Sequence, residues 1–185
     1  SAPLLHAVRL GWDGLLQRLL LLGVDPEVCD NRGMAALHHA ATLGRQYALK
    51  LLVAHGAAPD RRAADGQTPL GIALASGQRA LLEWLDWSNW RLPHRRLQAS
   101  DLPAAAIAGD LPAVQRLLAL GFAVDAVDAQ GCTALLRAAG SGHHELVSYL
   151  LTQAANPDLA ASTGATPLSA AVSKRQLAIV DLLLQ

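Results

Sequence analysis

Aromatic side chains and cysteines are scarce in this 185-residue sequence, which contains four Trp, two Tyr, one Phe and two Cys. Two cysteines are too few for the disulfide framework of a small secreted domain. Charged residues make up only 16% of the chain, and 15 Lys and Arg balance 15 Asp and Glu. Because a nucleic-acid-binding domain needs a net basic face to displace counterions, this balance predicts no nucleic-acid partner.

Long apolar runs are also absent. The longest, Leu19–Val24 and Leu117–Val124, are far shorter than the ~20 residues that span a bilayer, so we expect no direct membrane insertion of this segment. The N-terminus shows no signal-peptide pattern, and we expect a cytoplasmic protein. Since the chain stops at Leu182–Gln185 within a helical pattern, we also expect it to be an excised segment of a longer protein.

Leucine and alanine, in contrast, supply 73 of the 185 residues, and they follow a regular period. Glycine recurs every 32 or 33 residues, each time seven residues after a leucine. These glycines are Gly11, Gly44, Gly77, Gly109 and Gly142, and the leucines are Leu4, Leu37, Leu70, Leu102 and Leu135. A sixth copy keeps Leu168 but has Arg175 in place of the glycine. Such self-similarity at a fixed period predicts a repeat array.

Each repeat is predicted to form a helix, a tight turn, a second helix and an extended loop. Pairs such as Ala40-Ala41 and Ala138-Ala139 fall within the first helix, where small side chains let neighbouring helices approach closely. The recurrent glycine suits the left-handed position that ends a helix. Because one helix pair cannot bury its apolar face alone, adjacent repeats are expected to stack.

The helix starts carry the most specific motif. Thr68-Pro69-Leu70 and Thr166-Pro167-Leu168 place a capping hydroxyl, a proline at the first helical position and a core leucine in succession. Thr133-Ala134-Leu135 is a weaker version, and Ala35-Ala36-Leu37-His38 lacks the hydroxyl cap. These motifs, with the 33-residue period, resemble the ankyrin repeat.

The resemblance implies an all-α ankyrin-repeat solenoid of stacked helix-turn-helix units with β-turn finger loops. Asp30–Gly33 and Asp128–Gly131 resemble the fingers, and His38 would make the hydrogen bond that joins neighbouring repeats. We expect one ankyrin-repeat domain over residues 1–185, with repeats at approximately 1–29, 30–62, 63–94, 95–127, 128–160 and 161–185.

The pattern breaks between the third and fourth repeats. Three of the four tryptophans fall within seven residues at Trp84–Trp90, one residue is deleted, and Gln98 replaces the finger glycine. Pro103 takes the place of the histidine, although Ser100 or Asp101 could still cap the next helix. Two interpretations stay open: the tryptophans fill volume where regular packing is lost, or they form an exposed binding patch. The residues of this patch are Trp87, Trp90, Arg91, His94, Arg95 and Arg96.

Motifs of catalysis and metal binding are missing from the sequence. His144-Glu145 begins like a zinc-protease helix, but Ser148 stands where the second histidine ligand belongs. Phosphate-binding loops, nucleophile elbows and EF-hand loops are not found. We therefore predict no enzyme activity, no cofactor and no metal. We expect Cys132, near a finger, to be the accessible thiol and Cys29 to fill space.

The ankyrin resemblance implies recognition of another protein through the concave surface formed by the fingers and the inner helices. The repeat register nominates the contact positions Arg32, Met34, Thr42, Leu43, Arg45, Asp65, Gln67, Ser76, Gln78, Ile107, Asp110, Gln130, Ser141, Thr163 and Lys174. The sequence leaves two alternatives open. One is a regulatory or targeting module of a larger enzyme or membrane protein, and the other is an anion-binding site near Arg91–Arg96.

Overall fold

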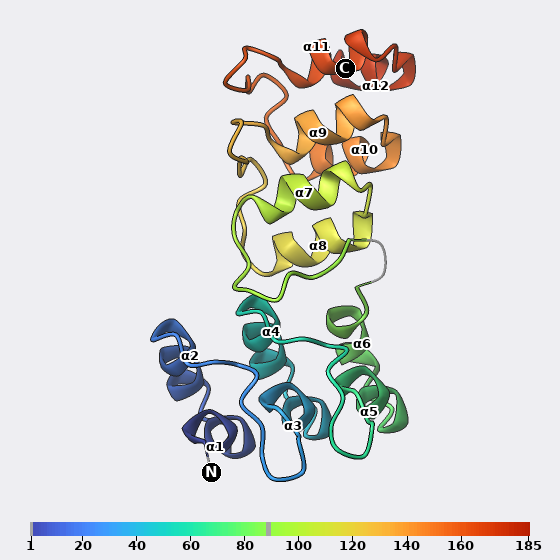
Figure 1. Cartoon of the computed structure of the whole chain (residues 1–185). Coiled ribbons are helices and arrows are strands. Elements are labelled where there is room, and N and C mark those ends of the chain that lie inside the picture. The colour runs from blue at the N-terminus through green and yellow to red at the C-terminus, as the bar shows by residue number, and fades with distance from the viewer. Residues whose placement is uncertain (1, 88–89) are drawn as a thin grey trace. The chain divides into compact units, whose positions relative to one another are not determined.

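The computed structural model describes residues 2–87 and 90–185, and within them the backbone forms twelve α-helices connected by turns and loops (Figure 1). Contacts between Cα atoms divide the chain into two compact units, the first ending at Leu97 and the second beginning at Gln98. Each unit contains three consecutive helix pairs. The all-helical repeat fold predicted from the sequence is confirmed.

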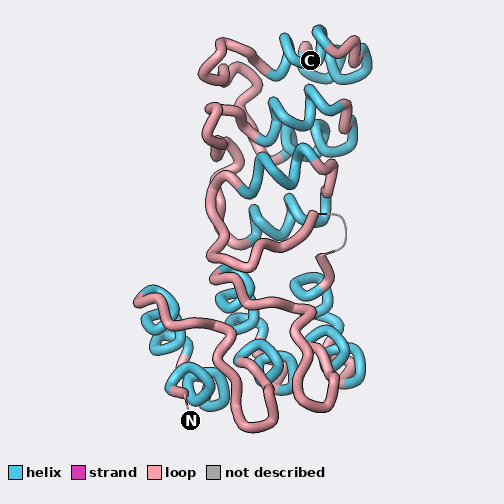
Figure 2. The backbone as a smooth tube through the Cα atoms, viewed as in Figure 1, coloured by secondary structure: helices cyan, strands magenta, loops and turns pink. Residues whose placement is uncertain are grey.

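In the first unit, the first helices of the pairs pack in the order α1, α3, α5, and the second helices pack in the order α2, α4, α6. A short turn joins the helices of a pair, and a longer loop leads to the next pair (Figure 2). The six helices are α1 (Pro3–Leu10), α2 (Asp13–Leu21), α3 (Ala36–Thr42), α4 (Gln46–Ala54), α5 (Pro69–Ala75) and α6 (Arg79–Leu85).

The second unit repeats this arrangement. Its middle first helix, α9, packs against both α7 and α11, and α10 packs against α12. The six helices are α7 (Asp101–Ile107), α8 (Leu111–Ala119), α9 (Ala134–Ser141), α10 (His144–Thr152), α11 (Pro167–Ser173) and α12 (Leu177–Leu183).

The turns within the pairs explain the recurrent glycine. Gly11 and Gly142 adopt left-handed backbone conformations, with φ of 74° and 81°. A residue with a Cβ pays a steric cost there, which glycine avoids. Arg175 nevertheless holds the same conformation, with φ of 55°, so the sixth copy keeps the turn without the glycine.

Hydroxyl caps start the first helices as predicted. The Thr68 hydroxyl oxygen accepts the N–H of Gly71 at 3.0 Å, and Thr166 and Thr133 accept the equivalent N–H groups at 3.2 Å. Each cap satisfies one of the backbone donors that a helix start leaves unpaired. The fourth repeat differs, because Ser100 makes no side-chain cap bond. Asp101 Oδ2 instead accepts the N–H of Gln98 at 2.7 Å.

The core lies between the helix layers of each unit. Leu4, Leu37, Leu102 and Leu135 are at most 1% exposed, and burial of such a side chain stabilises the fold by roughly 1.5–3 kcal/mol. The alanine pairs Ala40-Ala41 and Ala138-Ala139 are 0% exposed. Small side chains at these contacts account for the alanine content of the sequence.

Candidate functional site

The fingers are β-turn hairpins that precede the first helices. Asp30 donates its N–H to the carbonyl of Met34 at 3.0 Å, and Gly33 allows the sharp reversal with φ of 72°. The Asp30 carboxylate accepts the N–H groups of Arg32 and Met34 at 2.9 and 3.0 Å. The carboxylate therefore fixes the turn, and the Arg32 side chain is left exposed.

Successive fingers are hydrogen-bonded to one another within each unit. The N–H of Ala64 donates to the carbonyl of Arg32 at 3.0 Å in the first unit. In the second unit, the N–H of Ser162 donates to the carbonyl of Gln130, also at 3.0 Å. The same backbone contact in both units places the finger tips side by side as one ledge per unit.

A contact between two side chains holds the base of a finger in each unit. Asp128 Oδ2 lies 2.6 Å from Arg137 Nη2, and Asp30 Oδ2 lies 3.1 Å from His39 Nε2. Partial burial raises the pKa of Asp128, but the hydrogen bonds from Arg137 and from the Cys132 and Gln130 amides outweigh it and hold the pKa below its usual value. Burial likewise raises the pKa of Asp30, but the hydrogen bonds from the Met34 and Arg32 amides and from His39 outweigh it and hold the pKa below its usual value.

His38 joins neighbouring helix pairs, as the ankyrin resemblance implies. Its Nδ1 accepts the N–H of Ala35 at 3.1 Å, so the ring proton is on Nε2, which contacts the carbonyl of Gln67 at 3.2 Å. The side chain is 0% exposed. Burial lowers the pKa of His38 more than the hydrogen bond to Gln67 raises it, which keeps the ring neutral.

Most of the nominated contact positions are exposed in their own unit. The exposed positions are Arg32, Thr42, Leu43, Asp65, Gln67, Ser76, Ile107, Gln130, Ser141, Thr163 and Lys174. Met34, Arg45 and Gln78 are half-buried. Exposure makes the first group available to a partner without showing that any of them contacts one.

Arg45 and Gln78 have a packing role that the register did not predict. Each lies over the turn glycine of the preceding pair, so that a Cβ added at Gly11 would overlap Arg45 and one at Gly44 would lie 3.0 Å from the Gln78 amide. His143 covers Gly109 in the same way and contacts the carbonyl of Ile107 at 3.0 Å. His143 thus packs on the turn of the preceding pair.

Asp110 is a correction to the nominated surface. Its side chain is 2% exposed, and its Oδ1 accepts the N–H of Ala113 at 3.0 Å as the cap of α8. A buried helix cap is unavailable to a partner, and we remove Asp110 from the candidate surface. The sequence signal was an aspartate directly before an apolar helix, which also indicates a cap.

The tryptophan cluster divides between the two interpretations. Trp84 fills volume, because it is 3% exposed and Lys50 Nζ lies 4.4 Å from its ring centroid. Its indole N–H has no partner among the described residues, so packing comes at the cost of one buried donor. Trp87 and Trp90 are half-buried, with ring centroids 5.7 Å apart. Ser88 and Asn89, between them, lie outside the described residues.

The basic residues of the divergent patch are exposed, but the patch is anchored at its end. Arg91, His94, Arg95 and Arg96 are all exposed. The backbone of Arg95 lies directly over Gly56, and the N–H of Leu97 donates to the carbonyl of Ala54 at 2.8 Å. The segment therefore leaves the repeat pattern to cover the end of α4.

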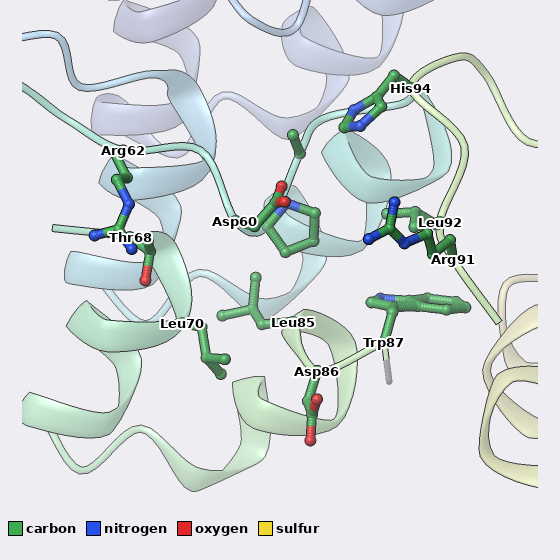
Figure 3. A pocket seen from close by; sticks show the side chains of 12 residues that line it. Asp60, Arg62, Thr68, Leu70, Leu85, Asp86, Trp87, Arg91, Leu92 and His94 are labelled. Carbon is green, nitrogen blue, oxygen red and sulfur yellow. The ribbon is translucent and has the colours of Figure 1, made fainter. Parts of the chain in front are cut away.

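A pocket of about 510 Å³ lies between this segment and the loop after α4 (Figure 3). Asp60, Leu85 and Leu92 are among its lining residues, together with Trp87 and Arg91. The sequence pattern singled out Trp87 and Arg91 but missed the other three. A signal for Asp60 did exist, because it stands four residues after Gly56, where Glu27 and Asp125 follow Gly23 and Gly121.

The two cysteines reverse the expected accessibility. Cys29 is exposed and Cys132 is 6% exposed, and both are free thiols. Cys132 is buried because it begins the returning arm of its finger, where it packs with Leu136 and Ala161. Within residues 2–87 and 90–185, no three His, Cys, Asp or Glu side chains are grouped as metal ligands.

The described helices include none that is long and apolar enough to cross a bilayer. The family model described as "Ankyrin repeats (3 copies)" matches residues 4–86 and 102–185. The unmatched residues 87–101 contain the divergent segment.

Three curated proteins illustrate the similarity. The L-asparaginase of Dirofilaria immitis is 31% identical over 183 residues, which cover 98% of this chain and 30% of that protein. The potassium channel AKT2/3 of Arabidopsis thaliana is 29% identical over 157 residues, covering 84% and 19%. The ankyrin repeat and KH domain-containing protein mask-1 of Caenorhabditis elegans is 32% identical over 154 residues, covering 78% and 6%. The chain thus spans less than a third of the length of each relative.

The helix pairs, the linked fingers and the buried inter-repeat histidine agree with a family match that extends over most of the sequence. The chain belongs to the ankyrin repeat family.

Proposed function

We propose that the chain is a protein-interaction module that binds a protein partner through its fingers and inner helices. The observation that carries this proposal is the finger ledge of each unit. Backbone hydrogen bonds of 3.0 Å join the fingers, while the residues before the finger glycines expose charged and neutral polar side chains to solvent. A surface held rigid before binding loses little conformational entropy on association.

The side chains on the ledges suit a protein better than a highly charged ligand. The residues before the finger glycines are Arg32, Asp65, Gln130 and Thr163, which combine both signs of charge with neutral polar groups. A partner would therefore be recognised by several modest polar and apolar contacts. Only a few of the exposed positions are expected to carry most of the binding energy.

Site-specific photo-crosslinking in the full protein tests this proposal. A photoreactive amino acid at Arg32, Gln67 or Gln130 is expected to give a discrete protein adduct in lysate, which excess unlabelled chain should abolish. Exposed positions on the second helices, Gln17 and Gln115, provide matched controls. The same adducts from both sets of positions would contradict binding through the fingers.

A second candidate is a regulatory or targeting role inside a larger enzyme or channel. It is favoured by the small share of the relatives that the chain covers, 30% of the asparaginase and 19% of the potassium channel. The sequence of the parent gene tests it, because this role requires a catalytic or membrane domain beside the repeats. A parent made only of repeats would remove this candidate and leave the first intact.

A further inference from the structure

The loops that follow the second helices are locked to one another by a recurring contact. Glu27 Oε1 accepts the N–H of Ala58 at 2.9 Å in the first unit, and Asp125 Oδ1 accepts the N–H of Asn156 at 2.9 Å in the second. In both units the carboxylate comes from one loop and the amide from the next loop. Glu27 and Asp125 hold equivalent repeat positions, and so do Ala58 and Asn156. A carboxylate at this position therefore serves as the acceptor for the following repeat.

Asp60 occupies the equivalent position in the loop after α4, but among the described residues no amide of the next loop donates to its carboxylate. Its side chain is exposed, and among the described residues it accepts no hydrogen bond and forms no ion pair. The next loop departs from the pattern by one deleted residue and the tryptophan cluster. Arg91 and His94 of that loop also have no side-chain partner in the part of the chain that the structure describes.

Asp60 lines the pocket of about 510 Å³, a volume within the range of small-ligand sites. Figure 3 shows Asp60 near the centre of the view, with Leu85 below it and Arg91 and Trp87 to one side. The apolar part of the lining consists of Ala58, Pro59, Leu70, Leu85, Trp87 and Leu92. The pocket thus combines an apolar wall with the carboxylates of Asp60 and Asp86 and the guanidinium groups of Arg62 and Arg91.

We infer that this pocket binds an extended peptide segment of a protein partner, which takes the place of the missing loop contact. A backbone N–H of the peptide donates to the Asp60 carboxylate, just as the amides of Ala58 and Asn156 donate to the carboxylates of Glu27 and Asp125. A large apolar side chain of the peptide fills the space beside Leu92 and Trp87. An acidic residue of the peptide pairs with the guanidinium of Arg91.

Charge complementarity favours a peptide over a simple anion. Carboxylates and guanidinium groups line the same pocket, so a free anion would meet repulsion from Asp60 and Asp86 as well as attraction to Arg62 and Arg91. A peptide satisfies both groups, since it carries N–H donors as well as an acidic side chain. The pocket lies beside the third finger, since Arg62 and Thr68 line it, but its apolar lining and Asp60 are not among the finger residues, so the inference goes beyond the function proposed above.

Selection of a random twelve-residue peptide library, displayed on phage, against the intact chain tests the inference. We expect the enriched peptides to share a large apolar residue close to an acidic one. Asp60→Ala and Leu92→Asp should each lower the affinity of the chain for a selected synthetic peptide at least tenfold, as measured by calorimetry. Asp158→Ala is the matched control, because Asp158 holds the same loop position in the second unit and is exposed; its affinity should equal that of the unmodified chain.

Three outcomes would overturn the inference: no enriched family, equal affinity for the Asp60→Ala chain, or binding that only Arg32→Glu and Asp65→Lys abolish. The last outcome would place the peptides on the finger ledge and support the proposed function alone. Circular dichroism checks the fold of each variant. If Leu92→Asp fails to fold, Asp60→Lys serves instead, because Asp60 is exposed and unpaired in the described structure.

Discussion

His38 illustrates how one buried side chain links neighbouring repeats through a bond that depends on its protonation state. Its Nδ1 must stay unprotonated to accept the Ala35 N–H, while Nε2 contacts the carbonyl of Gln67. Protonation of Nδ1 would break the first bond. This geometry agrees with a pKa that burial lowers below the ordinary value of 6.5.

We therefore predict that His38→Leu destabilises the chain by about 1–3 kcal/mol at pH 7.5, because the buried Ala35 N–H and the part-buried Gln67 carbonyl lose their partner. The sign of the pH effect follows from the lowered pKa. The contribution of His38 to stability is complete above pH 6.5, the pKa of its side chain in the unfolded protein. It is lost as the pH falls through the lower pKa of the folded protein. The difference in urea midpoint between the two chains should shrink from pH 7.5 to pH 5.5.

The exposed His144 provides the control for this experiment. His144→Leu should leave the wild-type pH dependence nearly unchanged. If the His38→Leu chain lost stability with acid as steeply as the wild type, the proton linkage would have to lie elsewhere.

Thiol labelling separates the two cysteines. Cys29 is exposed, and Arg61 Nη2 lies 3.6 Å from its sulfur, whereas Cys132 is 6% exposed. We predict that a thiol reagent modifies one cysteine per folded chain and two in urea, as counted by mass spectrometry. Cys29→Ser should abolish the labelling of the folded protein, and persistent labelling of that variant would refute the burial of Cys132.

At this scale the sequence predicted contacts that depend on local spacing and missed those set by the neighbouring repeat. The threonine caps and the role of His38 were predicted correctly. The exposure of Cys132 and Asp110 was wrong. Both stand beside turns, where exposure is the default. Cys132 is buried in part by Ala161 of the following repeat, which a local sequence window does not contain, whereas Asp110 makes a local cap that the sequence also indicated.

The segment over residues 95–97 shows how an element can leave the repeat pattern and still be held. The Leu97 N–H bonds to the end of α4, and the Arg95 backbone occupies the space above Gly56. A Cβ at Gly56 would come within 2.6 Å of that backbone, whereas one at Gly121 would have no atom within 4 Å. The two glycines have similar φ values, 92° and 97°.

This pair gives a matched prediction for the divergent element. Gly121→Ala should cost about 1–2 kcal/mol from left-handed strain alone. Gly56→Ala should cost more, because it must also displace the backbone at Arg95. Urea denaturation measures both, and hydrogen exchange of the Leu97 amide should accelerate only in Gly56→Ala. Equal costs and equal exchange would mean that the segment is not anchored there.

The regular elements followed from the sequence because each repeat supplies a template for the next. The divergent segment has no such template. Its deletion and the replacement of the finger glycine by Gln98 indicated a break, but not the direction that the chain takes afterwards. The pocket beside Asp60 arises from that direction, and therefore only the structure could identify it.

Over the whole molecule, the 33-residue period produces equivalent contacts in both units. Fingers are joined by the same backbone bond, and loops by the same carboxylate–amide bond. In a repeat protein, stability is approximately a sum of such nearest-neighbour contacts. The loop carboxylates should therefore differ in their contribution according to whether the next loop supplies its amide.

Alanine substitution of the loop aspartates tests this rule across the chain. Asp125→Ala should cost about 0.5–1.5 kcal/mol, because the Asn156 amide loses its acceptor at 2.9 Å. Asp60→Ala should change the free energy of unfolding by less than about 0.5 kcal/mol, since its carboxylate has no described partner. Asp125 is the cleaner probe than Glu27, whose second oxygen also pairs with Arg61 at 2.6 Å. A substantial loss from Asp60→Ala, measured by urea denaturation, would mean that Asp60 already holds the chain together and is not open to a ligand.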